Sequence, residues 1–182
     1  MKGVCVGCIL VLVLTFFTLS SFAAEGGNLL VNPGFEKADS LGWDLYGDST
    51  YDTETYKSGI QSGKAWVWDY GDGLFEQYVD VIPGTQYKAS VSVLSKPGDP
   101  ISGDSKAWIQ IEWFTAENAV IGDPVKSSPL AGASDTWAIL STPTAIAPPS
   151  AAKAKIKVVI QAAQKNTPGS CYFDDADFRT VP

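Results

Sequence analysis

The sequence predicts an all-β protein folded as an antiparallel β-sandwich or jelly roll. About nine short segments alternate apolar and polar residues with the two-residue period of a β-strand. Clusters of Pro, Gly and Asp separate these segments, as expected for turns. No stretch carries a sustained apolar pattern with the 3.6-residue period of a helix. The nearest candidate, Pro149–Gln164, has a β-branched Lys-Ile-Lys-Val-Val-Ile centre, which favours a strand.

The expected strands of the first half are ended by recognisable turns. Pro33-Gly34 closes the first, Gly71-Asp-Gly73 ends the third, and Pro83-Gly84 signals a type II turn after the fourth. In the second half, Pro143 interrupts a strand and indicates a sheet edge or a bulge. The expected strands lie in Asn28–Glu36, Tyr51–Tyr56, Ala65–Tyr70, Phe75–Val81, Tyr87–Leu94, Trp108–Thr115, Trp137–Ile146, Lys153–Gln161 and Cys171–Arg179.

The first residues have the features of a secretion signal. Lys2 precedes the uncharged stretch Gly3–Ala24, which contains the apolar run Ile9–Leu19 and ends in small residues. We therefore expect residues 1–24 to be a signal peptide and 25–182 to form one domain, because no Pro-, Ser- or Gly-rich linker divides the rest. An uncleaved anchor is the alternative. With cleavage, the protein is expected to be secreted, either extracellular or periplasmic, and free of the membrane.

Composition excludes several classes of function. The chain has no histidine, so Ser-His-Asp and Cys-His catalysis and imidazole-based zinc sites are excluded. Cleavage would remove Cys5 and Cys8 and leave Cys171, which we expect to be a buried free thiol. It would also remove Lys2 and leave the mature chain more acidic than the formal −7 of the whole chain. This charge argues against nucleic acid and anionic membranes as partners and suits neutral polymers and bound cations.

Two tryptophans stand out in the segment Ser62–Tyr78. Trp66 and Trp68 are separated by one residue, so in a strand both indoles leave the sheet on the same side. Ala65 and Val67 would then form the opposite, core-facing side. The two indoles are either covered by another part of the chain or form a flat apolar platform for a ligand.

Four segments together resemble the carbohydrate-binding modules of the family 4/9/22 type, which are β-jelly rolls of the galactose-binding-like superfamily. The likeness covers nearly the whole mature chain. Its segments are Asn28–Glu36 with Gly42-Trp43, Ser58–Ala65, Gln77–Tyr87 and Tyr172–Phe178.

The resemblance implies a non-catalytic, monomeric protein that binds a polysaccharide of the β-glucan or xylan type on a concave sheet. It places Ala65 and Val67 in the core and turns Trp66 and Trp68 toward the concave face. An indole packs on the C–H-rich face of a pyranose, while amides and carboxylates bind its hydroxyl groups. The other expected ligand residues are Tyr70, Glu76, Tyr78, Trp108, Gln110 and Glu112. The remaining tryptophans, Trp43, Trp113 and Trp137, are expected in the core.

The resemblance also implies a structural calcium ion. Glu36 would be one ligand, Asp174 or Asp175 another, and backbone carbonyls at Gly34 and near Lys57 would complete the shell. Calcium takes 6–8 hard oxygen ligands of these kinds. Because Asp174 and Asp175 are adjacent, they point to opposite faces of a strand, and only one of them can easily reach the ion.

Alternatives remain for each assignment. In place of the calcium site described above, Asp174 and Asp175 would be acids at the end of a strand without a metal, or the loop Asp69–Gly73 would bind calcium instead. In place of a binding module, the fold also suits a glycoside hydrolase, for which Glu76 and Glu112 would be the carboxylate pair. A surface or matrix protein that uses the fold for protein contacts is the third class.

Overall fold

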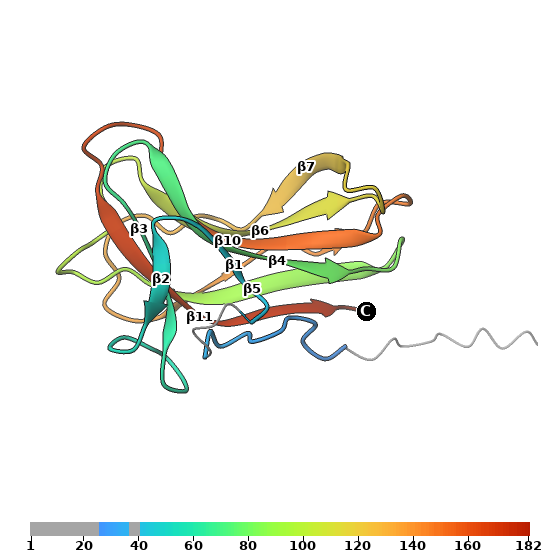
Figure 1. Ribbon diagram of the computed structural model, residues 1–182, viewed down its shortest axis with the longest axis horizontal. Coiled ribbons are helices and arrows are strands. Elements are labelled where there is room, and N and C mark those ends of the chain that lie inside the picture. The colour runs from blue at the N-terminus through green and yellow to red at the C-terminus, as the bar shows by residue number, and fades with distance from the viewer. Residues whose placement is uncertain (1–25, 37–40) are drawn as a thin grey trace, which may run out of the picture.

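Two antiparallel β-sheets packed face to face form the structure, a computed structural model that describes residues 26–36 and 41–182 (Figure 1). The predicted signal peptide, with Cys5 and Cys8, lies outside these residues. The described part contains strands and no helix, which confirms the predicted fold class. Accordingly, no helix able to cross a membrane occurs in the described ranges.

The first sheet, sheet A, has five strands in the order β1-β4-β10-β6-β7. The second, sheet B, has the order β2-β3-β11-β5-β8, with β9 also paired to β5. Sheet A comprises β1 (Asp44–Gly47), β4 (Gly71–Asp80), β10 (Lys153–Ala162), β6 (Lys106–Phe114) and β7 (Val120–Lys126). Sheet B comprises β2 (Ser49–Asp52), β3 (Ser62–Val67), β11 (Gly169–Thr180), β5 (Gln86–Leu94), β8 (Ala138–Ser141) and β9 (Ala145–Ile146).

The core lies between the sheets and is made of the inward-facing half of each alternation. Its members include Ala65 and Val67 of β3, as predicted, together with the buried Ile and Val residues of β6 and β10. Burying one such side chain stabilises the fold by about 1.5–3 kcal/mol. Cys171 is a buried free thiol, as expected.

The predictions for the core tryptophans are confirmed in two of three cases. Trp43 is fully buried, stacks on Phe35 with ring centroids 4.8 Å apart, and donates its indole N–H to the Asn32 carbonyl at 2.9 Å. Trp113 is also buried. The prediction for Trp137 is wrong: it is half-buried, because it directly precedes β8, which lies at the edge of sheet B.

Several predicted strand bounds need correction. Asn28–Glu36 forms no strand: Asn32 and Phe35 adopt positive φ angles of 50° and 56°, which fold the segment into turns. The tryptophan strand ends at Val67 rather than Tyr70, and Gly71–Gly73 begins β4 instead of forming a turn. The two edge strands β1 and β7 were not predicted. The interruption at Pro143 is confirmed, since it falls between β8 and β9.

Candidate functional site

The eight predicted ligand residues do not share one surface. Trp66 lies on the outer face of sheet B, whereas Glu76, Tyr78, Trp108, Gln110 and Glu112 lie on the outer face of sheet A. The prediction of one concave face for all of them is therefore wrong. The alternation of a strand gives the face of each side chain but not the sheet to which the strand belongs, and β3 and β4, consecutive in sequence, belong to different sheets.

The outer face of sheet A carries a layer of polar side chains on three adjacent strands. Across these strands Glu76 pairs with Lys157 and Lys157 with Gln110, while Tyr78 pairs with Lys155 and Lys155 with Glu112. We call this surface the polar face. It consists of Glu76 and Tyr78 of β4, Lys155 and Lys157 of β10, and Trp108, Gln110 and Glu112 of β6.

One continuous set of contacts crosses the polar face. The Trp108 indole N–H donates to Gln110 Oε1 at 2.5 Å, and Gln110 Nε2 donates to Glu112 Oε1 at 2.5 Å. The Lys157 ammonium lies 3.0 Å from Glu112 Oε1 and 3.6 Å from Glu76 Oε2. Lys155 Nζ completes the set at 2.9 Å from Glu76 Oε1. These contacts hold the side chains in fixed positions. Glu76 and Gln110 are buried within the layer, and the half-buried members are Trp108, Glu112, Lys155 and Lys157.

Lys155 is kept charged by its neighbours. Burial acts to lower its pKa, but hydrogen bonds with Tyr78 and Glu76 outweigh burial and hold the pKa of Lys155 above its ordinary value. The ammonium also lies 4.6 Å from the centre of the Tyr78 ring. The polar face therefore presents a fixed cation next to an aromatic ring that is 43% exposed.

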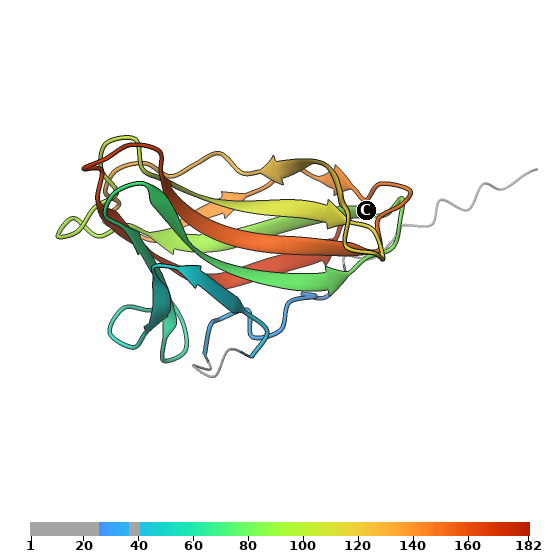
Figure 2. The same ribbon diagram turned by 45° about the horizontal axis from the view of Figure 1, so that its top comes forward.

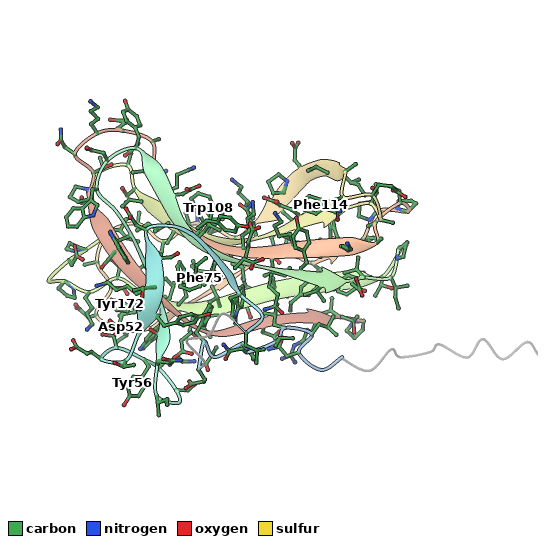
Figure 3. All side chains as sticks on the ribbon, in the orientation of Figure 1. Asp52, Tyr56, Phe75, Trp108, Phe114 and Tyr172 are labelled. Carbon is green, nitrogen blue, oxygen red and sulfur yellow. The ribbon has the colours of Figure 1, made fainter. Side chains whose placement is uncertain are left out.

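Aromatic rings bound the polar layer at both ends. Tyr78 packs edge-on against Phe114, with centroids 5.4 Å apart, and Lys126 of β7 lies 4.6 Å above the centre of Trp108. Figure 3 shows Trp108 and Phe114 on the outer side of sheet A. In Figure 1 the ribbons of β7 and the first part of β4 rise on either side of β6 and β10, so the sheet curves around this face.

A separate pocket of about 310 Å³ opens on the outer face of sheet B. We call it the indole pocket; it is lined by Thr50, Asp52, Lys64, Trp66, Trp68 and Asp99. Trp66 is half-buried in its wall, while Trp68 follows the end of β3 and is 69% exposed. The predicted platform residues thus lie together, but on the sheet opposite the polar face. Tyr70, 65% exposed, lines a neighbouring hollow with Trp68 and lies outside the indole pocket.

The predicted calcium residues meet around Gly34. A methyl group added at Gly34 would lie 3.5 Å from Glu36 Oε1 and 3.8 Å from Asp174 Oδ1, so both carboxylates flank this glycine. Glu36 Oε2 accepts the Ile60 N–H at 2.9 Å, whereas Glu36 Oε1 is buried without a hydrogen bond. A buried carboxylate oxygen without a partner is costly unless a cation or water binds it.

Asp174 and Asp175 have different surroundings. Asp174 is fully buried and accepts N–H groups of Lys57 at 2.7 Å, Ser58 at 3.1 Å and Asp175 at 2.7 Å. Asp175 instead pairs with Lys57 Nζ at 2.8 Å and accepts the Ser58 hydroxyl at 2.6 Å. The positive φ of 47° at Asp175, within the bulge of β11, separates the two side chains.

The pKa values of Asp174 and Asp175 are shifted in opposite directions, because the two carboxyl groups have different hydrogen-bond partners. Burial raises the pKa of Asp174 above its ordinary value, although three backbone N–H groups oppose the shift. For Asp175, burial acts in the same direction, but the hydrogen bonds with Lys57 and Ser58 outweigh it and hold the pKa low. Among the residues that the structure describes, no basic side chain forms an ion pair with Asp174.

The donor set around Gly34 fits a calcium ion. Glu36 Oε1 and Asp174 Oδ1 are hard oxygen ligands, the kind that calcium prefers. Among the residues described, no group of three or more His, Cys, Asp or Glu side chains is placed to hold a metal. A calcium ion here would therefore take its other ligands from backbone carbonyls, as expected for Gly34 and Lys57, or from water.

Sequence reasoning missed residues at both surfaces. Lys155 and Lys157 of the polar face alternate with buried Ile156 and Val158, and this pattern was a usable signal for an outward basic row. Thr50, Asp52 and Asp99 of the indole pocket lie on a strand and a loop distant from Trp66 in sequence. Their spacing gave no sign that they would meet.

The fold is similar to that of known carbohydrate-binding modules. The xylan-binding domain CBM22-1 of Paenibacillus barcinonensis Xyn10C is 16% identical over 87% of this chain and 98% of that domain, with a TM-score of 0.62. TmCBM61, solved in complex with β-1,4-galactotriose, is 16% identical over 83% of this chain and 97% of that module, with a TM-score of 0.57. The chain therefore has the β-sandwich fold of these modules, as the sequence resemblance implied.

Part of an enzyme's chain is similar to this fold. The enzymatically active domain of bacteriophage CBA120 tailspike protein 4 is 15% identical over 85% of this chain, with a TM-score of 0.63, but the match spans only 21% of that longer chain. No protein-family model matches the sequence, and a search of curated proteins gives no match. At these identities the likeness establishes the fold, and function has to be argued from the sites.

Proposed function

We propose that this protein is a secreted, non-catalytic carbohydrate-binding protein that binds a polysaccharide along the polar face. The observation that carries the proposal is the continuous set of contacts from Trp108 through Gln110, Glu112, Lys157 and Glu76 to Lys155. It holds carboxylates, an amide and ammonium groups at fixed positions between the exposed ring of Tyr78 and the half-buried ring of Trp108. A sugar chain needs both kinds of group, because its hydroxyls bind polar atoms and its C–H faces pack on rings.

The proposed ligand is a β-linked glycan of the xylan or β-glucan type. A xylan-binding domain and a module that holds β-1,4-galactotriose share the fold, which supports a sugar ligand. The polar face extends over three adjacent strands, from Tyr78 on β4 to Trp108 on β6. Such an extended surface suits several consecutive sugar rings.

The acid pair on this face favours binding over hydrolysis. Glu76 and Glu112 both contact the same Lys157 ammonium, and Glu76 also pairs with Lys155. A glycosidase needs one carboxyl group free to protonate the leaving oxygen and a second one to act on the sugar or on water. Here both side chains belong to an ion-pair network, so the half-buried Glu112 binds hydroxyl groups and the buried Glu76 orders the lysines.

A structural calcium ion belongs to the proposal. Glu36 and Asp174 are its side-chain ligands, supported by the buried unpaired Glu36 Oε1 and by the position of Asp174 beside Gly34. Asp175 is not a ligand, because its carboxylate is paired with the Lys57 ammonium and the Ser58 hydroxyl, whereas it is Asp174 Oδ1 that lies beside Gly34 and Glu36. The ion would tie the Gly34 turn to the Tyr56–Ser62 turn and to β11.

A glycan array tests the function. The mature protein, residues 25–182, is expected to bind xylan or β-glucan oligosaccharides and to release no reducing sugar from them. Sugar release that disappears in Glu76→Gln or Glu112→Gln would establish an enzyme. Absence of binding to every plant and microbial glycan would favour the use of the fold for protein contacts.

A further inference from the structure

The indole pocket is a candidate ligand site independent of the polar face. The two surfaces belong to opposite sheets, with the core between them. Figure 3 shows Asp52 and Tyr172 at sheet B, apart from Trp108 on sheet A. A ligand at one surface therefore leaves the other free.

The pocket combines an apolar wall with polar side chains. Trp66 and Trp68 supply two indoles on one side, and Thr50 and Asp52 on the neighbouring strand supply hydroxyl and carboxylate oxygens. Asp52 uses its Oδ1 to accept the N–H groups of Glu54 and Thr55, at 3.0 and 2.7 Å, which fixes the carboxylate. An exposed indole, a half-buried indole and a fixed acceptor thus meet at one place.

Lys64 adds a positioned donor. Its ammonium lies 5.4 Å from the centre of the Tyr172 ring and 6.0 Å from that of Trp66, between two aromatic side chains. Across residues 26–36 and 41–182 it forms no salt bridge. Rings hold the ammonium in place while its N–H bonds stay open to a ligand oxygen.

The far wall of the pocket depends on a close backbone approach. A Cβ at Gly169 would lie 2.5 Å from the Ile101 Cα and 2.7 Å from the Pro100 carbonyl oxygen, so only glycine lets the loop at Asp99 lie against β11. Ser170 fastens this loop by donating its N–H and hydroxyl to the Asp99 carbonyl, both at 3.3 Å. Backbone packing and these two hydrogen bonds therefore fix the position of this wall.

We infer that the indole pocket binds the terminal sugar of a neutral glycan, which makes the protein bivalent and able to cross-link polysaccharide chains. Its volume of about 310 Å³ is at the lower end of the range for ligand pockets, roughly 300–1,000 Å³, and suits a chain end rather than a chain interior. Acidic Asp52 and Asp99 beside basic Lys64 leave no excess of positive charge for an acidic sugar. Sugar binding in the indole pocket is inferred from the residues that line it. Cross-linking also requires the polar face to bind a polysaccharide, so it rests on the proposed function.

Tryptophan side-chain N–H signals in NMR locate the ligand directly. On titration with chain-end oligosaccharides of xylan, β-glucan and β-1,4-galactan, the signals of Trp66 and Trp68 are expected to shift in addition to that of Trp108. Shifts of Trp108 alone would overturn the inference and leave the proposed function intact. Shifts of Trp66 and Trp68 alone would support the pocket and contradict the polar face. No shift with any of the three would count against both.

Cross-linking is tested with soluble xylan, β-glucan and β-galactan. The wild type is expected to raise the viscosity of the polysaccharide that it binds, and the Trp66→Ala/Trp68→Ala variant to lose this effect while it still migrates slowly in gels that contain the same polymer. Lys64→Ala, which keeps both indoles, should weaken the effect several-fold. Ile139→Ala, an exposed apolar residue elsewhere on sheet B, is the matched control and should behave as wild type. Wild-type viscosity with the double variant would contradict cross-linking.

Discussion

Trp108 donates its indole N–H to Gln110 Oε1 at 2.5 Å, and this bond ties the ring to the polar layer beside it. A fixed ring loses little conformational entropy when a sugar packs on it. The fixed positions of the side chains on the polar face thus make this surface of the sheet suited to bind a polysaccharide.

Replacement of Trp108 should weaken glycan binding without unfolding the protein. Trp108→Ala removes a ring worth about 1–2 kcal/mol of contact with sugar, so the Kd should rise roughly tenfold. Trp108→Phe keeps a ring but loses the N–H, and an intermediate Kd is expected. Calorimetric titration with the oligosaccharide that the array selects gives these values. An unchanged Kd for Trp108→Ala would remove this residue from the site.

Calcium removal should lower the Tm. At a calcium concentration about 100 times its Kd, binding would stabilise the fold by about 2.7 kcal/mol, and a chelator should abolish this contribution. Glu36→Gln should melt at the same temperature with and without calcium. Asp175→Asn is the matched control and should keep the calcium effect. The gain should shrink in acid, because the raised pKa of Asp174 lets protons compete with the ion.

The ion pair of Asp175 with Lys57 should contribute to stability only above acid pH. The pKa of Asp175 is lowered in the fold, so its contribution is present above the unfolded-state value of about 4 and is lost as the pH falls through the lower folded value. Urea unfolding of Asp175→Asn between pH 5 and pH 2, in chelator, should show a shallower loss than the wild type. Asp123→Asn, on exposed β7, serves as control. Parallel curves for wild type and Asp175→Asn would contradict the assignment.

Gly169→Ala should disturb the wall of the indole pocket. The added Cβ would meet the backbone at Ile101 and Pro100, which costs about 1–3 kcal/mol through displacement of the loop. Gly98→Ala in the same loop meets nothing within 4 Å and should be neutral. Denaturant midpoints of the two variants give the comparison. Equal midpoints would show that the loop does not pack as described.

Local sequence pattern was enough to predict the fold class, since segments such as that of Ile109 and Ile111 alternate with the period of a strand. The core positions of Ala65 and Val67 were implied by the family resemblance. The same pattern failed for Trp66 and Glu76, because the pairing of strands distant in sequence decides which sheet each one joins. Figure 2 shows the two layers of strands between which the chain crosses. The strands β3 and β4 lie in different sheets, as do β1 and β2. The Glu36 and Asp174 pair came from the family resemblance, and the choice between Asp174 and Asp175 required the bulge in β11.

The most direct test of the central claim is affinity electrophoresis of the mature protein in gels that contain xylan, β-glucan or β-galactan. We expect one of these polymers to retard the wild type and Ile139→Ala equally, and Tyr78→Ala/Trp108→Ala to lose most of the retardation. Equal retardation of the wild type and the Tyr78→Ala/Trp108→Ala variant would contradict binding on the polar face.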